Sequence, residues 1–187
     1  MSWYCDYAEE KAHHKTYHDA EYGFPQTDER ALFELQCLEL NQAGLSWDII
    51  LKKRPTLKAA YDNFEVDKVA AYGDRDTARL LSDPGIIRNR LKVAAAIENA
   101  KRIQALRDSH GGFAAWIAAH HPLTRSQWTK LFRQQSKFMG GEIVNELLMC
   151  IGYLPGAHRE NCPIFAKTTK LSPPWMEAAK DFYTEDA

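Results

Sequence analysis

Four residues near the two ends of the chain have the chemistry of metal ligands. His158 and Cys162 stand four positions apart near the C-terminus, while Cys5 and His18 lie near the N-terminus with twelve residues between them. Two thiolates and two imidazoles suit a tetrahedral zinc ion, and four protein ligands leave no open position for substrate or water. The pattern therefore indicates one structural zinc ion that ties the two termini together.

Spacing alone leaves a second interpretation open, because the two pairs lie about 140 residues apart in the sequence. The four residues could be unrelated surface and core side chains. Five other histidines compete as ligands: His13, His14, His110, His120 and His121. Cys37 and Cys150 fall within apolar helical stretches and are expected to be core thiols. The residues by themselves do not decide between the two interpretations.

A carboxylate also falls where an apolar side chain is expected. Leu32, Leu35 and Glu39 lie along one side of a helical repeat. A buried charge is unfavourable unless something compensates it. If the end of this helix faces a cavity, we expect three aromatic rings there with Glu39: Tyr17, Tyr22 and Trp47. Such a cage suits a cationic, planar ligand, whereas the alternative is a surface glutamate beside a core tryptophan.

The stretch LLSDPGIIRNRLK, residues 80–92, has the pattern of a helix-hairpin-helix. Pro84 and Gly85 form a tight turn, and Ile86 is expected to open the second helix. Backbone N–H groups at that helix start would be free to bind a phosphate. Three basic residues cluster there: Arg88, Arg90 and Lys92. A helix-hairpin-helix of this kind binds the DNA backbone without reading the base sequence. The alternative interpretation is an ordinary corner between two helices with a solvated basic face.

The spacing of apolar residues is helical over most of the chain, which predicts an all-α fold with short connections. We expect helices over 29–43, 46–54, 75–82 and 88–108, a short helix around Trp116, and another from about residue 142. Pro55 is expected to end the second of them. The irregular ends, residues 1–28 and 140–187, are expected to form a zinc-binding terminal lobe, and 29–139 a helical domain with the hairpin.

Composition narrows the class of protein. A chain of 187 residues with 45% hydrophobic residues can bury one substantial core. Its formal net charge of −1 argues against a general polyanion binder, although local basic patches are compatible with it. We find neither an apolar run of about 18 residues nor a secretory signal, so we expect a cytoplasmic protein with no membrane partner.

Together these features resemble the 3-methyladenine DNA glycosylase I family of the helix-hairpin-helix DNA glycosylase superfamily. The resemblance runs from about Trp3 to Cys162 and rests on the metal spacings and four motifs: YHDAEYGFP, LELNQAGLSW, DPGIIRNR and KFMGGEI. It implies an all-α helix-hairpin-helix glycosylase domain with a zinc-stabilised lobe formed by both termini. The implied zinc ligands are Cys5, His18, His158 and Cys162. The implied base pocket consists of Glu39, Tyr17, Tyr22 and Trp47.

The function implied by the resemblance is hydrolysis of the N-glycosidic bond of 3-methyladenine in alkylated double-stranded DNA. Methylation of a ring nitrogen makes the base cationic, so it leaves as a neutral base without a strong general acid. The enzyme would flip the nucleotide out, stack the base on aromatic rings and let Glu39 accept its hydrogen bonds. The resemblance is to a branch that lacks the superfamily's catalytic aspartate. We expect a monofunctional, monomeric enzyme that leaves an abasic site and needs no protein partner.

Three alternatives stay open at this point: a non-catalytic zinc-stabilised DNA-binding module, a glycosylase for a different alkylated base, and a zinc-dependent hydrolase. The first would not need Glu39 in an aromatic cage, and the last would require an open metal position. The chain also departs from the family, which often has a tryptophan at Tyr22 and threonines at Gly141 and Glu142. A glutamate facing phosphate would be unfavourable. Residues after Lys167 extend beyond the resemblance.

Overall fold

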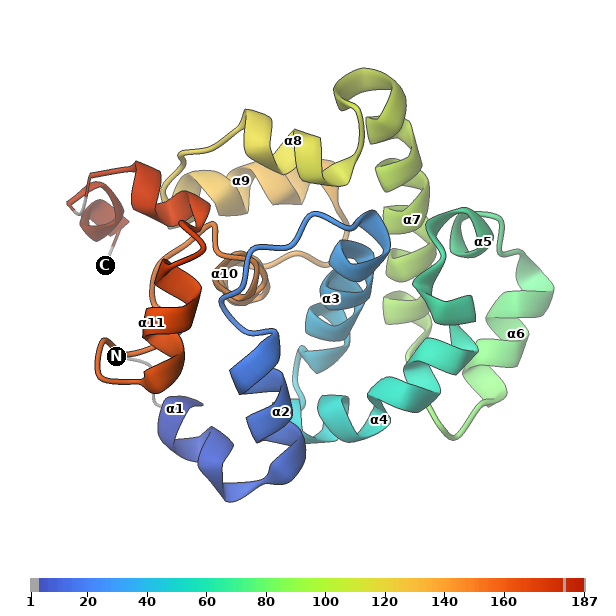
Figure 1. The fold of residues 1–187 in the computed structure, drawn as a ribbon. Coiled ribbons are helices and arrows are strands. Elements are labelled where there is room, and N and C mark those ends of the chain that lie inside the picture. Colours follow the sequence, from blue (N-terminus) through green and yellow to red (C-terminus); the bar gives the residue numbers. More distant parts are fainter. Residues whose placement is uncertain (1–3, 180, 187) are drawn as a thin grey trace.

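The computed structural model describes residues 4–179 and 181–186, so Trp3 lies outside it. All the regular elements of the described chain are helices and none is a strand, which confirms the predicted all-α class (Figure 1). The α-helices are α1 Tyr4–Tyr7, α2 Ala12–Ala20, α3 Glu29–Gln42, α4 Trp47–Ala60, α5 Val66–Ala70, α6 Asp74–Ser82, α7 Arg90–His110, α8 Phe113–Ala119, α9 Arg125–Gln135, α10 Gly141–Cys150 and α11 Pro163–Thr169. The described residues also form four 3₁₀ helices, of which the last two follow α11: η1 Ala8–Glu10, η2 Asp62–Phe64, η3 Pro174–Glu177 and η4 Phe182–Asp186. None of the described helices has both the length and the apolarity to cross a bilayer.

Short polar side chains set the starts of several helices. Asp28 accepts a hydrogen bond from the Ala31 N–H at the start of α3, and Ser46 accepts one from Ile49 at the start of α4. Each cap satisfies one of the backbone donors that a helix start leaves unpaired. At its other end, α7 stops at Gly111, whose φ of 82° is in the left-handed region. The local sequence therefore explains most of these boundaries.

Pro55 does not end the second predicted helix, and that prediction was wrong. Helix α4 continues through the proline to Ala60. A proline in a helix removes one backbone hydrogen bond. Leu57, two residues further on, is fully buried, and Ala60 is nearly so. Packing of these residues outweighs the local cost, because tertiary burial contributes most of the stability of a helix.

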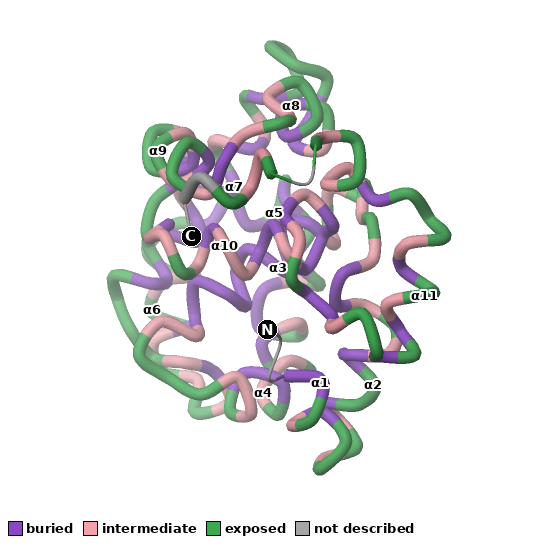
Figure 2. The backbone as a smooth tube through the Cα atoms, turned by 90° about the vertical axis from the view of Figure 1, so that its left-hand side faces the viewer, coloured by how far each residue is buried: buried purple, intermediate pink, exposed green. Residues whose placement is uncertain are grey.

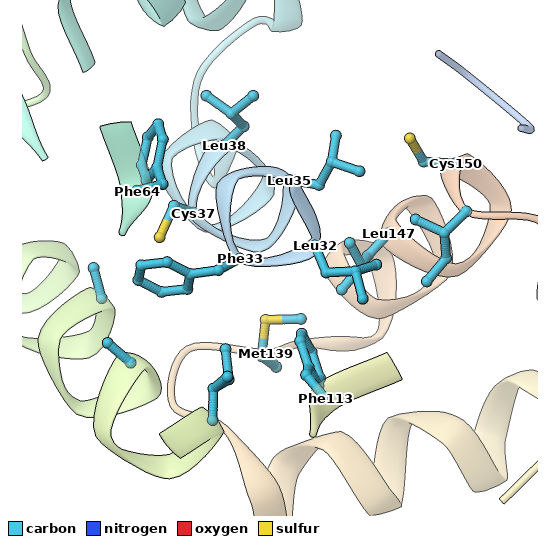
Figure 3. Packing of buried hydrophobic residues seen from close by; sticks show 14 of the residues in the cluster. Leu32, Phe33, Leu35, Cys37, Leu38, Phe64, Phe113, Met139, Leu147 and Cys150 are labelled. Atoms are coloured by element: carbon cyan, nitrogen blue, oxygen red, sulfur yellow. The ribbon is translucent and has the colours of Figure 1, made fainter. Parts of the chain in front are cut away.

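Helix α3 lies at the centre of the core. Every residue from Leu32 to Asn41 is buried, and helices α4, α5, α7, α8 and α10 all pack against it. Figure 3 shows its apolar side chains meeting Phe113 on one side and Leu147 of α10 on another. The tube coloured by burial in Figure 2 shows the same concentration of buried residues in the interior. A helix that is enclosed on all sides has no solvent-facing stripe, so its polar side chains must find partners inside the protein.

The helix-hairpin-helix pattern corresponds to α6, a turn at Pro84 and Gly85, and α7. The second helix begins at Arg90, however, and not at Ile86 as predicted. Asn89 sets this start, because its side-chain oxygen accepts hydrogen bonds from the N–H groups of Leu91 and Lys92, at 3.0 and 3.2 Å. Two of the donors that we expected to be free for phosphate are thus already used inside the protein.

Lys92 does not belong to an exposed basic surface at the hairpin, as its position beside Arg88 and Arg90 suggested. Its side chain is buried, and its Nζ donates to the carbonyl oxygens of Asn41 and Ala43, at 2.7 and 2.6 Å. These carbonyls belong to the C-terminal end of α3, where helix carbonyls lack intrahelical partners. The ammonium group also meets the negative end of the helix dipole there. Lys92 therefore holds the end of α3 to α7.

We expect Lys92→Met to destabilise the fold, because it leaves one buried and one partly buried carbonyl group without their charged donor. The loss should be roughly 2–3 kcal/mol in the free energy of unfolding, measured by urea denaturation. Lys101→Met is the matched control, since Lys101 lies exposed on the same helix, and it should change stability by less than about 0.5 kcal/mol. Equal stability of both variants and the wild type would contradict this role for Lys92.

Candidate active site and metal centre

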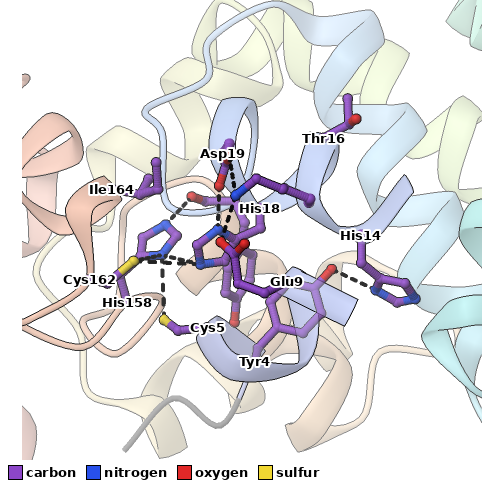
Figure 4. A network of polar contacts seen from close by, with 12 residues as sticks. Tyr4, Cys5, Glu9, His14, Thr16, His18, Asp19, His158, Cys162 and Ile164 are labelled. Carbon is purple, nitrogen blue, oxygen red and sulfur yellow. Dashed lines mark hydrogen bonds and ion pairs between the residues drawn. The ribbon is translucent and has the colours of Figure 1, made fainter. Parts of the chain in front are cut away.

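The four predicted metal ligands meet at one buried point. Their side-chain donor atoms all lie within 4.8 Å of one another (Figure 4). Cys5 comes from α1 and His18 from α2, whereas His158 lies in the loop after α10 and Cys162 directly precedes α11. The cluster thus joins the two ends of the chain, as predicted. Among the described residues, none of the competing histidines belongs to this group.

Hydrogen bonds orient both imidazoles toward the centre of this cluster. The Nδ1 of His18 is 2.8 Å from Asp19, and the Nε2 of His158 is 2.6 Å from the carbonyl oxygen of Tyr22. In each ring the outward nitrogen takes the proton, which leaves His18 Nε2 and His158 Nδ1, 3.1 Å apart, as the inward lone pairs. Two such nitrogens with two thiols form a closed donor set that could bind a metal ion.

A cavity of about 700 Å³ opens at the C-terminal end of α3. Its lining includes all four predicted base-pocket residues: Glu39, Tyr17, Tyr22 and Trp47. The rings pack edge to face or tilted, with centroids 5.3 Å apart for Tyr17 and Trp47 and 5.8 Å apart for Tyr17 and Tyr22. These separations are typical of favourable aromatic pairs. The aromatic walls of the cavity are therefore packed against one another before any ligand binds.

Glu39 is the chemically unusual group of this cavity. It is only 3% exposed, and its Oε2 has no hydrogen-bond partner. Two hydroxyl groups that line the same cavity are engaged elsewhere, since Tyr17 donates to the Cys150 sulfur and Tyr22 to Glu146. Burial raises the pKa of Glu39 well above its usual value, and the charge of Glu146 raises it further. A buried acceptor without a partner at a cavity wall is suited to a ligand that supplies N–H donors.

Sequence reasoning missed several lining residues, of which Glu146 and Tyr4 matter most. Glu146 stands between Ile143 and Leu147 on α10 and so interrupts an apolar stretch, the same signal that revealed Glu39. The Tyr22 hydroxyl donates to its Oε2 at 3.0 Å. Tyr4 packs on Tyr22, with ring centroids 5.3 Å apart. No local pattern marks Tyr4, because it reaches the cavity only once the N-terminus has folded over.

A group of charged side chains lies at the rim of the cavity around Asp48. Its carboxylate accepts from Lys11 and His13, each at 2.9 Å, and from Lys52 at 2.8 Å. These donors hold the pKa of Asp48 well below its usual value. Although Asp48 and two histidines have metal-ligand chemistry, the two lysines already compensate its charge. We therefore describe this group as an ion-pair cluster.

Glu142, where the family often has a threonine, has a cationic partner. It forms an ion pair with Arg125, and its side chain is 85% exposed. The negative charge at this turn is therefore balanced by a neighbouring arginine, which reduces the repulsion expected beside a phosphate.

The hairpin turn is anchored to α4. The carbonyl oxygen of Gly85 accepts hydrogen bonds from Lys53 Nζ at 3.1 Å and from Thr56 Oγ1 at 2.7 Å. A Cβ atom added at Gly85 would lie 3.2 Å from the Thr56 Cβ, so the turn has little room for a side chain. Ile86 is buried and fixes the turn to the core, whereas the predicted contact residues Pro84, Arg88 and Arg90 are exposed.

Comparison with known proteins places the chain among DNA repair enzymes. Residues 7–152 match the methyladenine glycosylase family. The DNA-3-methyladenine glycosylase 1 of Escherichia coli is 35% identical over 151 residues, which are 80% of this chain and 81% of that protein. The DNA-3-methyladenine glycosylase of Haemophilus influenzae is 30% identical over 182 residues, covering 87% and 98%.

Solved structures agree with these sequence matches. The Staphylococcus aureus 3-methyladenine DNA glycosylase I, determined to explain 3-methyladenine recognition, superposes with a TM-score of 0.78 at 30% identity and covers 86% of this chain and 95% of that one. A variant of 3-methyladenine DNA glycosylase I in complex with 3-methyladenine gives a TM-score of 0.78 at 29% identity, covering 86% and 96%.

The helical fold, the hairpin, the aromatic cavity and the cluster at the termini define a helix-hairpin-helix DNA glycosylase. Within this class, the chain belongs to the methyladenine glycosylase family.

We expect metal removal to unfold the part of the chain that contains both termini, because small irregular segments depend on their ion for stability. A strong chelator should lower the thermal midpoint of the wild type by roughly 10 °C, measured by circular dichroism. Cys162→Ser, which removes one ligand, should show a similarly low midpoint that the chelator no longer changes. A wild-type midpoint that the chelator does not move would argue against a bound stabilising ion.

Proposed function

We propose that this chain is a DNA-3-methyladenine glycosylase, which hydrolyses the N-glycosidic bond of 3-methyladenine in alkylated double-stranded DNA. The observation that carries this proposal is Glu39, a buried carboxyl group with an unpartnered oxygen in a cavity walled by aromatic rings. The names of the two curated relatives state the same activity for those proteins. A non-catalytic DNA-binding module would have no use for such a costly group.

The chemistry follows from the charge of the substrate. Alkylation at a ring nitrogen makes the base cationic, and its attraction to Glu39 and to the faces of the rings stabilises it once it is flipped out. When the glycosidic bond breaks, its electron pair goes to the base, which leaves neutral. Water then adds to the sugar carbon and releases a proton, giving an abasic site. No strong general acid is required, so the pocket acts by binding and positioning.

Glu39 contributes hydrogen-bond acceptance in this scheme. Its free Oε2 is available to an N–H of the base, and a hydrogen bond to a charged acceptor in a dry site is stronger than one in water. Tyr17, Tyr22 and Trp47 provide the surfaces on which the base stacks. We propose that selection of the damaged base occurs here, since a neutral, normally paired base offers less charge and costs more to flip.

We further propose that Cys5, His18, His158 and Cys162 hold one structural zinc ion. Two thiolates and two imidazoles are typical zinc ligands, and the closed set leaves no position at which the metal could activate water. The contact from His158 to the Tyr22 carbonyl links this cluster to the pocket wall. Elemental analysis of the purified protein should find one zinc per chain.

For the DNA contact, we propose that the hairpin turn grips one backbone. Pro84 and Gly85 present the turn, Ile86 anchors it, and the exposed Arg88 and Arg90 approach phosphates. The Asn89 side chain already accepts hydrogen bonds from two N–H groups at the start of α7. We therefore propose that the turn and the two arginines make the contact with the DNA backbone. The enzyme is proposed to act in the cytoplasm as a monomer, without an obligatory protein partner.

The direct test of the function is base release from methylated duplex DNA, followed by chromatography. The wild type should release 3-methyladenine, and Glu39→Gln should release it about 10–100-fold more slowly in single turnover, because a charge-assisted hydrogen bond is lost. The variant should keep the fold and DNA affinity of the wild type. Full activity of Glu39→Gln would remove Glu39 from the mechanism, and no release by the wild type would refute the function.

The hairpin proposal predicts that Gly85→Val weakens binding of damaged and undamaged duplex alike, by roughly tenfold. The added side chain would displace the turn from Thr56. Fluorescence anisotropy of a labelled duplex measures both affinities. Gly73→Ala, at the other end of α6, has open space around the new Cβ and should bind both duplexes normally. A loss restricted to damaged DNA would contradict a backbone-only contact.

A further inference from the structure

Two helices each bring a carboxyl group to the same cavity. Glu39 comes from α3 and Glu146 from α10, and both line it. Glu146 is half-buried and accepts a hydrogen bond from the Tyr22 hydroxyl at 3.0 Å. Within the described part of the chain, neither carboxyl group forms an ion pair with a lysine, arginine or histidine. The cavity therefore holds two acidic groups without a directly paired cation, although Arg125, which pairs with Glu142, also lowers the pKa of Glu146 from a distance.

Other acidic side chains near this cavity form direct ion pairs. Asp48 at the rim is paired with Lys11 and Lys52, and the exposed Glu142 is paired with Arg125. The two groups that form no direct ion pair are thus the more enclosed ones, where an unpaired charge is most costly. Burial raises the pKa of both Glu39 and Glu146. A cationic ligand would supply the missing charge to both.

The chemistry of the Glu39 and Glu146 carboxyl groups limits the class of ligand that the cavity can bind. A single carboxylate could balance one positive charge, but a second acceptor on a different helix suits a ligand that also presents N–H donors along more than one edge. An alkylated aminopurine has both properties while it is attached to the sugar, because it is cationic and carries an exocyclic amino group. After the bond breaks, the base keeps the amino group and loses the charge.

We propose that Glu146 is a second base-binding residue, whose carboxyl group accepts a hydrogen bond from the flipped base and, with Glu39, makes the pocket prefer the cationic alkylated base to the neutral product. This inference rests on the proposed glycosylase function. The preference for a cation would also promote product release. The base leaves as a neutral molecule and so loses the charge that both carboxyl groups favour.

A simpler role for Glu146 would be to hold the Tyr22 ring through its hydroxyl. Two substitutions separate the roles. Glu146→Gln retains an acceptor for the Tyr22 hydroxyl and removes the charge, whereas Tyr22→Phe removes that hydrogen bond and retains the charge. If Glu146 only positions the ring, Glu146→Gln should be close to silent and Tyr22→Phe harmful.

The experiment compares two free ligands by calorimetry at mildly alkaline pH: the permanently cationic 3,9-dimethyladeninium, in which a methyl group replaces the sugar, and the neutral 3-methyladenine. We expect Glu146→Gln to weaken binding of the cation by about tenfold, a loss of about 1.4 kcal/mol, and to change binding of the neutral base by less than about twofold. Tyr22→Phe should weaken both ligands by similar factors. Asp108→Asn removes an exposed carboxylate on α7 and serves as the charge control.

The inference is overturned if Glu146→Gln leaves the preference for the cation unchanged, either because both affinities hold or because both fall equally. Base release from methylated DNA by the same wild-type preparation separates the two proposals. Release with an unchanged preference in Glu146→Gln refutes only the role of Glu146. Absence of release refutes the proposed function itself.

Discussion

The structure depends on a carboxyl group that the fold keeps from water. Glu39 sits on α3, which is buried along ten consecutive residues from Leu32 to Asn41, so its side chain cannot turn to solvent. Lys92 holds the carbonyls at the end of that helix and thereby fixes where the cavity opens. The protein stabilises this costly arrangement with a large apolar core on the other sides of α3. The unsatisfied oxygen is left for the ligand.

The N-terminal segment completes the pocket, and four side chains that could bind a metal ion join it to the C-terminal part of the chain. Tyr4, Tyr17 and Tyr22 come from the N-terminal segment, which has little core of its own. The cluster joins this segment to the loop and helix that follow α10. His158 then extends the link, because its outward nitrogen bonds the carbonyl of Tyr22. We propose that a metal ion held by this closed donor set would help to place the aromatic wall without taking part in the reaction.

Much of this site could be predicted from residue types and spacing. Residue types mark the two ligand pairs as candidates, but only the resemblance to the family selects them, whereas Glu39 is marked directly because it interrupts an apolar stripe. Glu146 carries the same signal on α10 and was overlooked. Tyr4 could not be found, since only the folded N-terminus brings it to the cavity. Spacing also could not exclude the competing histidines, because ligand selection depends on tertiary contacts.

The fold shows a similar division between local and tertiary control. Caps such as Asp28 and Ser46 are local signals and mark helix starts well. The passage of α4 through Pro55 and the burial of Lys92 are decided by packing partners far away in the sequence. The start of α7 was misplaced for a local reason, since the apolar Ile86 and Ile87 suggested a helix while Asn89 provides the cap.

Glu39 is a buried carboxyl group with an unpartnered oxygen, and its ionisation can be observed directly. The measurement is a pH titration of the Glu39 side-chain carboxyl carbon by NMR, in the free protein and with 3,9-dimethyladeninium bound. We predict a pKa well above the ordinary glutamate value in the free protein, because of burial and Glu146, and a clear decrease when the cation binds. An ordinary pKa in the free protein that the ligand does not move would contradict the account.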